Sequence, residues 1–220
     1  MSYQGLEELK LIDQNLKNYN EKIVDFFVDK VNQKTVSVLD FGAGIGTLTE
    51  IFFKKTSIKP ECFEICPKSQ EILTQKGFKI QNEFIKKEKY DLIYSANVLE
   101  HIEQDFETVG ELRKMLKKDG SLIIFVPAFN LLFSEADVKF GHFRRYNIGR
   151  LKKICEDNNL EIENINFFDS LGFFILFFMK LFKINSLQKI NAKNLKFYDK
   201  FFVKINKIFD IFFRKICGKN

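Results

Sequence analysis

A glycine-rich loop is the stretch of the chain whose residue types and spacing point most clearly to chemistry. Residues 38–50 read as a short buried strand, a loop with Gly42, Gly44 and Gly46, and the start of a helix. Glycines let a backbone turn tightly and approach a ligand closely, as in nucleotide-binding sheets. The Gly-x-Gly-x-Gly spacing is not that of dinucleotide sites, and Asp40 places a carboxylate just before the loop. A carboxylate suits a ligand with an ammonium group better than a pyrophosphate; the alternative is a glycine turn of another α/β protein.

A second acidic residue has the spacing of a ribose ligand. Glu64 ends a short apolar segment and lies 22 residues after Gly42. In doubly wound sheets, an acid about 20 residues beyond the glycine loop meets a ribose. An ionised carboxylate has two acceptor oxygens, so Glu64 can accept hydrogen bonds from both ribose hydroxyls. A lone glutamate at a strand end is otherwise usually just solvated.

The chain has two histidines, and both are candidates for proton transfer. His142 stands in a Gly-His-Phe-Arg-Arg-Tyr stretch, and an unperturbed imidazole titrates in the range that suits a general base. Arg144 and Arg145, with Tyr146 beside them, are candidates to hold a carboxylate or phosphate of a substrate. The alternative for this stretch is a loop pinned by Arg–carboxylate pairs. His101 is expected closer to the glycine loop, where it either orients the backbone or takes a proton.

A parallel sheet is needed to bring these side chains together. Helical or turn segments separate the apolar stretches, and this alternation is typical of an α/β protein. Ligands of such sheets bind at the carboxyl ends of the strands, where the glycine loop, Glu64 and the connection that carries His142 are expected. Strands are predicted at residues 38–41, 62–65, 90–97 and 119–127, with a sixth strand at 160–168.

These landmarks resemble a class I S-adenosylmethionine (SAM)-dependent methyltransferase. The resemblance rests on the loop at 39–46, Glu64, Asn-Val-Leu-Glu-His-Ile at 97–102 and Lys-Asp-Gly-Ser-Leu at 118–122. Asn-Tyr-Asn at 18–20 and the stretch that ends in Arg-Arg-Tyr resemble a type 11/12-like subgroup often encoded beside glycosyltransferases of polysaccharide and lipid-glycan pathways. The resemblance implies a Rossmann-like sheet with helices on both faces, and SAM as the cofactor.

The resemblance also implies individual roles. Asp40 would meet the methionine amino group through backbone and water, and Asn82 would reach the adenine amine. Asn97 and Leu99 would line the methionine side, and Tyr19 would either cover the cofactor or belong to the core. The residues implied to bind the cofactor are Asp40, Gly42, Ala43, Gly44, Glu64, Asn82, Asn97, Leu99 and Tyr19.

Charge, one sequence motif and cysteine content limit the kinds of molecule and ion that the protein is expected to bind. The net charge is +6, but residues 167–220 carry 11 Lys and Arg against 3 Asp, so the preceding part is slightly acidic. The basic character belongs to the end of the chain, which disfavours nucleic acid as a partner. Methyltransferases that act on nucleobase amines resemble one another in an Asn/Asp-Pro-Pro-aromatic turn after the fourth strand. This chain has Asn-Val-Leu-Glu at 97–100 instead, so a nucleobase amine is not the expected acceptor. The four cysteines lack paired metal spacing, so no metal ion is expected.

One domain and a tail of different character are predicted: a SAM-binding methyltransferase domain at 1–166, with a lid helix in 1–32, and a basic, Phe-rich helical tail at 167–220. An apolar run at 173–179 is far shorter than the roughly 20 residues that span a bilayer. Residues 193–217 predict an amphipathic helix suited to an anionic membrane surface. The alternatives are packing on the chain's own domain and oligomerisation. The seventh strand of class I methyltransferases is uncertain here.

Together these features predict a SAM-dependent methyltransferase that acts on a small-molecule, lipid-linked or saccharide acceptor at a membrane surface. Residues 1–10 are polar and show no signal peptide, so a cytoplasmic location, peripheral on the inner face of the membrane, is expected. One alternative is a soluble small-molecule methyltransferase whose tail forms a lid. Another is a catalytically silent scaffold with a SAM-binding fold, and a dinucleotide oxidoreductase is the remaining one.

Overall fold

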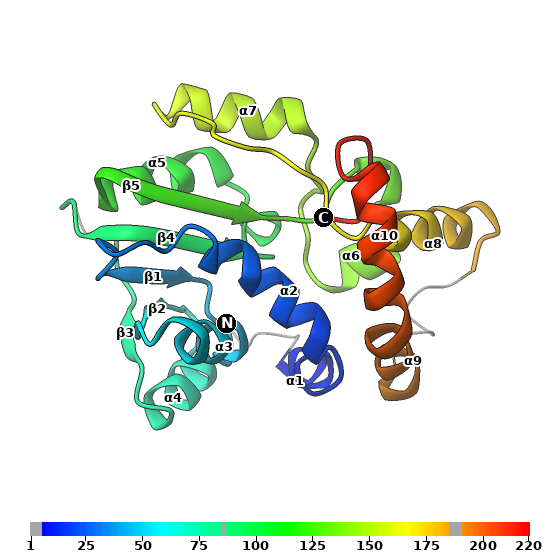
Figure 1. Ribbon diagram of the computed structural model, residues 1–220, viewed down its shortest axis with the longest axis horizontal. Coiled ribbons are helices and arrows are strands. Elements are labelled where there is room, and N and C mark those ends of the chain that lie inside the picture. The colour runs from blue at the N-terminus through cyan, green and yellow to red at the C-terminus, as the bar shows by residue number, and fades with distance from the viewer. Residues whose placement is uncertain (1–5, 85–86, 185–190) are drawn as a thin grey trace.

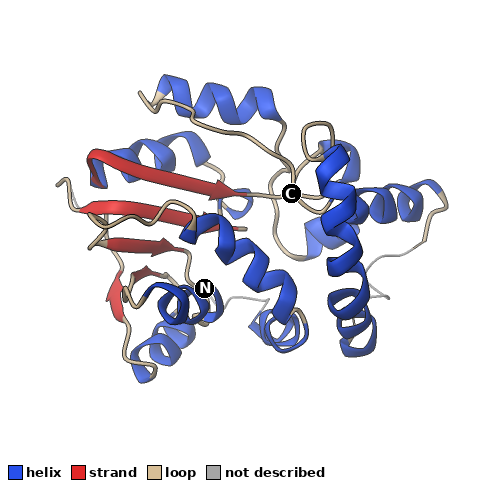
Figure 2. Cartoon of the chain, in the orientation of Figure 1, coloured by secondary structure: helices blue, strands red, loops and turns tan. Residues whose placement is uncertain are grey.

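The computed structural model describes residues 6–84, 87–184 and 191–220, and a parallel β-sheet with helices on both faces forms its centre (Figure 1, Figure 2). Within these residues the sheet has five strands in the order β3-β2-β1-β4-β5. The predicted α/β fold is confirmed, and the glycine loop follows the central strand. The strands are β1 (Val38–Phe41), β2 (Glu61–Phe63), β3 (Lys79–Gln81), β4 (Tyr90–Ala96) and β5 (Leu116–Phe125).

Helices cover both faces of the sheet (Figure 1). α2 and α3 pack on one face, and α5 and α7 pack on the other. The helices of the domain are α1 (Leu6–Asn15), α2 (Lys17–Val28), α3 (Thr47–Thr56), α4 (Pro67–Gln75), η1 (Leu99–His101), α5 (Asp105–Met115), η2 (Asn130–Leu132), α6 (Glu135–Lys139) and α7 (Ile148–Asp157).

Strand side chains alternate between two cores. Leu39 of β1 and Ile93 of β4 are paired in register and pack with α5 and α7. Their preceding neighbours, Val38 and Leu92, face α2 and α3. Successive side chains of a strand point to opposite faces, and both faces of this parallel sheet are buried. The sheet is therefore a rigid base for the loops at its carboxyl edge.

The segment after α7 differs from the prediction. Residues 160–168 form irregular backbone in the described structure, so the predicted sixth strand was wrong. Only the end of the segment finds a partner: Phe168 N donates to Asn220 O (2.8 Å), and Asn220 N donates to Phe168 O (3.1 Å). A strand needs a neighbour along its length. Asn220 supplies one for Phe168 alone.

The tail consists of helices that pack on the domain and on one another through polar and apolar side chains. Asp199, Val203 and Asn206 are buried, and their spacing places them on one helical face. Tyr19 N of α2 donates to Asp199 Oδ1 (2.9 Å), and Leu171 N of α8 donates to Asn206 Oδ1 (2.9 Å). These N–H groups belong to first helical turns, which lack partners within their own helix. The tail elements are α8 (Ser170–Leu181), α9 (Ala192–Phe197), a π-helical turn η4 (Tyr198–Phe202) and α10 (Val203–Phe213).

The tail also leaves apolar side chains on its outside. Ile211 and Phe212 of α10 are 72% and 69% exposed, and Leu181 and Phe182 at the end of α8 are also exposed. The predicted apolar run at 173–179 lies within α8. None of the helices in the described parts of the chain combines the length and the apolar character needed to cross a bilayer.

Candidate active site

A cavity of about 310 Å³ opens at the carboxyl ends of β1, β2 and β4. Its volume lies at the lower end of the range for small-molecule sites. The lining combines the glycine loop, the acid after β2, the turn after β4 and one side of α2. The predicted cofactor residues that line this cavity are Tyr19, Gly42, Ala43, Gly44, Glu64 and Asn97.

The glycine loop needs glycine at its first position for two reasons. Gly42 has a φ of 82°, a conformation that side chains with a Cβ rarely adopt. A Cβ on Gly42 would also lie 2.2 Å from Val98 Cγ2, in the turn after β4. The N–H groups of Gly42 and Ala43 donate to Phe63 O at 2.8 and 3.1 Å, which ties the loop to the end of β2.

Glu64 is held by backbone N–H groups. Its Oε1 accepts from the N–H groups of Ile65 and Cys66, and its Oε2 accepts from Gly44 N, each at 2.8 Å. A carboxylate offers about four acceptor positions, so Glu64 retains capacity for one further donor, on Oε2. The side chain joins the glycine loop to the second strand, and it lines the cavity.

Asp40 lies behind the loop, buried at the end of β1. Its Oδ2 accepts a hydrogen bond from Thr49 Oγ1 at 2.6 Å, which fastens the first turn of α3 to β1. Burial raises the pKa of Asp40 to about 7, although the hydrogen bond from Thr49 acts in the opposite direction. This placement is compatible with the indirect role expected for Asp40, and any effect on a ligand would pass through backbone or water.

The lid predicted within 1–32 corresponds to α1 and α2, and the tail holds it in place. Tyr19, Asn20 and Ile23 of α2 line the cavity. Tyr19 Oη donates to Asn220 Oδ1 (2.9 Å), and its ring lies 4.5 Å from the Lys219 ammonium. Tyr19 is therefore both part of the cavity wall and part of the contact between the two ends of the chain.

Besides Asp40, two of the predicted cofactor residues lie away from the cavity lining. Asn82 is exposed in the segment after β3, and Leu99 is fully buried in the core between the sheet and α5. Asn97 has a φ of 54° and turns the chain sharply after β4. Contact of Asn82 with an adenine stays a prediction, whereas Leu99 anchors the turn that presents its neighbours.

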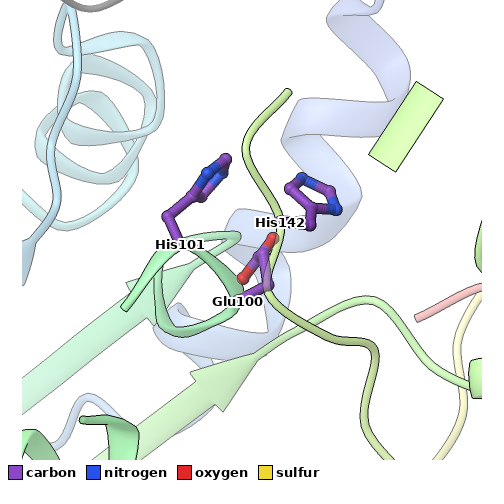
Figure 3. A group of neighbouring side chains, drawn as sticks. All are labelled: Glu100, His101 and His142. Carbon is purple, nitrogen blue, oxygen red and sulfur yellow. The ribbon is translucent and has the colours of Figure 1, made fainter. Parts of the chain in front are cut away.

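The turn after β4 brings the two histidines together. His101, at the end of η1, lines the cavity, and its ring meets that of His142 edge-on at a centroid distance of 4.6 Å (Figure 3). Burial, with the neighbouring His142 as a second cause, lowers the pKa of His101 to about 4. The connection after β5 therefore approaches the cavity edge, as the sequence predicted.

A buried carboxylate orients His142. Asp137 of α6 accepts from Arg145 Nε (2.9 Å), and its Oδ1 lies 2.9 Å from His142 Nδ1. Burial alone would raise the pKa of Asp137, but the hydrogen bonds from His142 and the charge of Arg145 lower it to about 2. With Nδ1 committed to the carboxylate, Nε2 is the ring atom of His142 that remains for a ligand or a proton.

Glu100, between Leu99 and His101, is the least satisfied group of the site. Its side chain is fully buried, and neither carboxylate oxygen has a hydrogen-bond partner among the described residues. Burial raises the pKa of Glu100 to about 8. Buried polar groups are nearly always paired, so an unpaired carboxyl at the edge of a cavity calls for an explanation.

The residues predicted to bind a substrate are engaged with the protein itself. Arg144 Nη1 donates to Ile102 O (2.6 Å), and Arg145 is buried against Asp137. Tyr146 Oη donates to Asp105 Oδ2 (2.8 Å). This geometry matches the alternative interpretation, a loop pinned by Arg–carboxylate pairs, and substrate contact by these three residues stays a prediction.

Sequence reasoning missed the roles of Glu100 and Asp137. Glu100 stood in the Asn-Val-Leu-Glu-His-Ile stretch and counted only toward the family resemblance. Its position next to His101 was a usable signal, because adjacent carboxylate and imidazole groups on a turn often share a task. Asp137 gave no such signal, because its contact with Arg145 depends on how the connection after β5 folds.

The comparisons with known proteins identify the family of the chain. The chain belongs to the methyltransferase domain family, whose model matches residues 12–165, and the recognition of a class I SAM-dependent methyltransferase is thereby confirmed. The matched region holds the whole sheet, the cavity lining and both histidines. No curated protein sequence matches the chain at a significant level.

Solved structures share the fold at low sequence identity. A SAM-dependent methyltransferase from Archaeoglobus fulgidus covers 93% of this chain and 90% of its own, with a TM-score of 0.60 and 16% identity. Phosphoethanolamine N-methyltransferase 2 from Haemonchus contortus, in complex with SAM, covers 88% of this chain with a TM-score of 0.59 and 16% identity, and this chain spans only 49% of it. Magnesium protoporphyrin IX methyltransferase from Synechocystis PCC 6803 with bound SAM covers 67% of this chain and 70% of its own, at a TM-score of 0.52 and 18% identity.

Proposed function

We propose that the protein is an enzyme that transfers a methyl group from SAM to a small-molecule acceptor. The observation that carries the proposal is a single cavity lined by the glycine loop, Glu64 and His101 in a chain of the methyltransferase domain family. SAM, when bound, supplies an electrophilic methyl group on a sulfonium. The relatives named above that carry SAM, and whose names give small-molecule acceptors, support both parts of the proposal.

The residues of the cavity fit the cofactor. Glu64 keeps acceptor capacity toward the cavity, as a ribose hydroxyl requires, and the glycine loop exposes backbone next to it. Asn97 and Tyr19 border the same space from the turn after β4 and from α2. We assign Glu64 to the ribose, the loop to close backbone contact, and Tyr19 to the cover of the site.

The histidine pair fits the acceptor end. His101 lines the cavity, and His142 presents Nε2 because Asp137 engages Nδ1. A nucleophile must be placed close to the methyl carbon, and a hydroxyl nucleophile must lose its proton. We assign this second task to the histidine pair.

The test separates binding from turnover. Glu64→Ala is expected to weaken binding of S-adenosylhomocysteine in calorimetry, whereas Glu71→Ala, an exposed glutamate on α4, serves as the control. His142→Ala is expected to leave binding intact and to reduce transfer of labelled methyl groups into a whole-cell extract. Unchanged turnover in His142→Ala would exclude a role for this histidine in the reaction, and binding without any turnover would favour the catalytically silent scaffold.

The exposed apolar surface supports an acceptor at a membrane. Leu131, Val138 and Phe143, in the connection that carries His142, are exposed, as are Ile211 and Phe212 of α10. Lysines stand among the apolar residues of the tail. Apolar side chains with interspersed lysines suit the surface of an anionic bilayer. The exposed lysines of this region include Lys196, Lys200, Lys204 and Lys207.

Two measurements test the membrane part. Changing Lys200, Lys204 and Lys207 together to Glu is expected to abolish co-sedimentation with vesicles that contain anionic lipid. Label from SAM is expected in the organic phase of the extract. Co-sedimentation that persists in the triple variant would contradict the proposed contact. Label confined to the aqueous phase would favour a soluble acceptor, with the tail serving to hold the lid helices α1 and α2 in place.

A further inference from the structure

We propose that Glu100, His101 and His142 bind a divalent transition-metal cation at the edge of the cofactor cavity. The inference rests on the proposed function, because it specifies how the histidine pair acts on the acceptor. It also departs from the sequence analysis, in which the cysteine spacing gave no reason to expect a metal.

The first argument is the grouping of ligand atoms. One oxygen of Glu100 and one ring nitrogen each of His101 and His142 lie within 4.8 Å of one another, and the two rings stand above the carboxylate (Figure 3). A cation bound at about 2.0–2.2 Å needs these atoms roughly 3–4 Å apart, which side-chain rotations can provide. Two imidazoles and one carboxylate suit Zn²⁺, Fe²⁺, Mn²⁺ or Co²⁺ better than Mg²⁺ or Ca²⁺.

The second argument is independent of this grouping. Both oxygens of Glu100 are buried without a hydrogen-bond partner among the described residues. The nearby guanidinium of Arg145 donates to both oxygens of Asp137, at 2.9 and 3.2 Å. A buried carboxylate needs a counter-charge or a donor, and a cation between Glu100 and the two rings would supply one.

The third argument is the support behind His142. Metal-bound histidines usually direct their other ring nitrogen to a carboxylate or carbonyl, which fixes the ring and its tautomer. Asp137 Oδ1, 2.9 Å from Nδ1, holds His142 in this way. Asp137 is itself fixed by Arg145 and by Ser134, whose N–H donates to Asp137 Oδ2 at 2.9 Å. The oriented ring presents Nε2 toward the group.

The position of the group assigns the cation a task. Three protein ligands leave coordination positions open, and His101 faces the cavity. An acceptor hydroxyl bound to the cation has a lowered pKa, so its proton leaves to water as the oxygen–methyl bond forms and the methyl–sulfur bond of SAM breaks. With the cation bound, the histidine pair would promote loss of the acceptor proton as ligands of the cation, which replaces the direct base role assigned to the pair above.

Cobalt binding to the full chain tests the site directly. Titration of metal-free protein with Co²⁺ is expected to give one bound ion per chain, with a visible spectrum that lacks an intense sulfur band and thus excludes the cysteines. Glu100→Gln is expected to weaken binding on the order of 100-fold, and Asp137→Asn about tenfold. Glu103→Gln makes the same charge change on an exposed side chain three positions away and is expected to bind as the unchanged protein does.

The outcomes are separable from the proposed function. S-adenosylhomocysteine binding is measured on the same proteins and is expected to survive Glu100→Gln. Absence of Co²⁺ binding, or equal binding by Glu100→Gln and Glu103→Gln, overturns the metal site; full turnover in the presence of a chelator does the same and returns His142 to the role of general base. If the unchanged protein does not bind S-adenosylhomocysteine, the proposed function is overturned instead.

Discussion

Two buried glutamates, Glu64 in the cavity lining and Glu100 next to the lining residue His101, differ in their hydrogen-bond partners. Glu64 accepts hydrogen bonds from three backbone N–H groups, whereas Glu100, although it is the more deeply buried, has no such partner among the described residues. The cofactor end of the site is therefore complete in the protein alone. The acceptor end contains a carboxyl group that lacks compensation until something binds there.

The largest effect is expected at the completed end. Gly42→Ala forces a Cβ into a positive-φ position and against Val98, and strain plus overpacking should lower the free energy of unfolding by about 2–5 kcal/mol and abolish cofactor binding. Urea unfolding and calorimetry measure both. Gly141→Ala is the control, because its φ is also positive but its Cβ would meet open space; an equal loss in both variants would show that strain alone matters.

Glu64→Gln tests the hydrogen bonds themselves. The amide keeps one acceptor oxygen but turns an NH2 group toward backbone N–H donors, so the free energy of unfolding should fall by about 2–3 kcal/mol. Binding of S-adenosylhomocysteine should weaken as well. Glu71→Gln on the exposed face of α4 is the matched control. Unchanged stability of Glu64→Gln would mean that the loop does not depend on this carboxylate.

Glu100→Gln should have the opposite sign. Above pH 8, where the Glu100 carboxyl of the metal-free protein ionises, removal of this uncompensated buried charge should raise the free energy of unfolding by about 1 kcal/mol. Thermal unfolding in a chelating buffer, compared with Glu103→Gln, measures the difference. A loss as large as that of Glu64→Gln would contradict the contrast between the two ends, because it would reveal a stabilising partner for Glu100.

The smallest effect is expected where the tail meets the lid. Asp199→Asn retains an acceptor for Tyr19 N but removes the negative charge from the start of α2, so stability should fall by about 0.5–1 kcal/mol. S-adenosylhomocysteine affinity should fall a few-fold, because α2 lines the cavity. Asp119→Asn, on an exposed part of β5, is the control. Identical affinity of the two variants for S-adenosylhomocysteine would show that the contact between the tail and α2 does not influence cofactor binding.

The arrangement of the glycine loop and Glu64 around the cavity was predictable from sequence because its determinants are local. Gly42 and Asp40 lie within one strand-loop-helix unit, and Glu64 is one strand away. Glycine has few other reasons to recur at that spacing. The pairing of His101 with His142 was foreseen only as the passage of a connection over the site, because the 40 residues between them must fold before the rings meet.

The tail was the least predictable region, for a physical reason. Its apolar periodicity predicted a helix for a membrane surface, with packing on the domain as an alternative, and gave no sign that the polar residues Asp199 and Asn206 would face inward. They do so because the first turns of α2 and α8 present backbone N–H groups that need acceptors. The need of these N–H groups for acceptors depends on which helix ends lie near the tail. No local sequence pattern in the tail could therefore predict that Asp199 and Asn206 meet it.

The contact of Asp199 with the start of α2 also sets an order of assembly during synthesis. The backbone N–H of Tyr19 can donate to Asp199 only after 180 further residues have been synthesised. The hydroxyl of Tyr19 can donate to Asn220 only when that residue has been added. Loop closure over such distances is slow compared with local helix formation. The nascent domain can thus form its sheet early, while the wall that α2 gives to the cavity is fastened only after residues 199 and 220 have been synthesised. A nascent chain stalled before residue 199 should therefore bind S-adenosylhomocysteine more weakly than the finished protein.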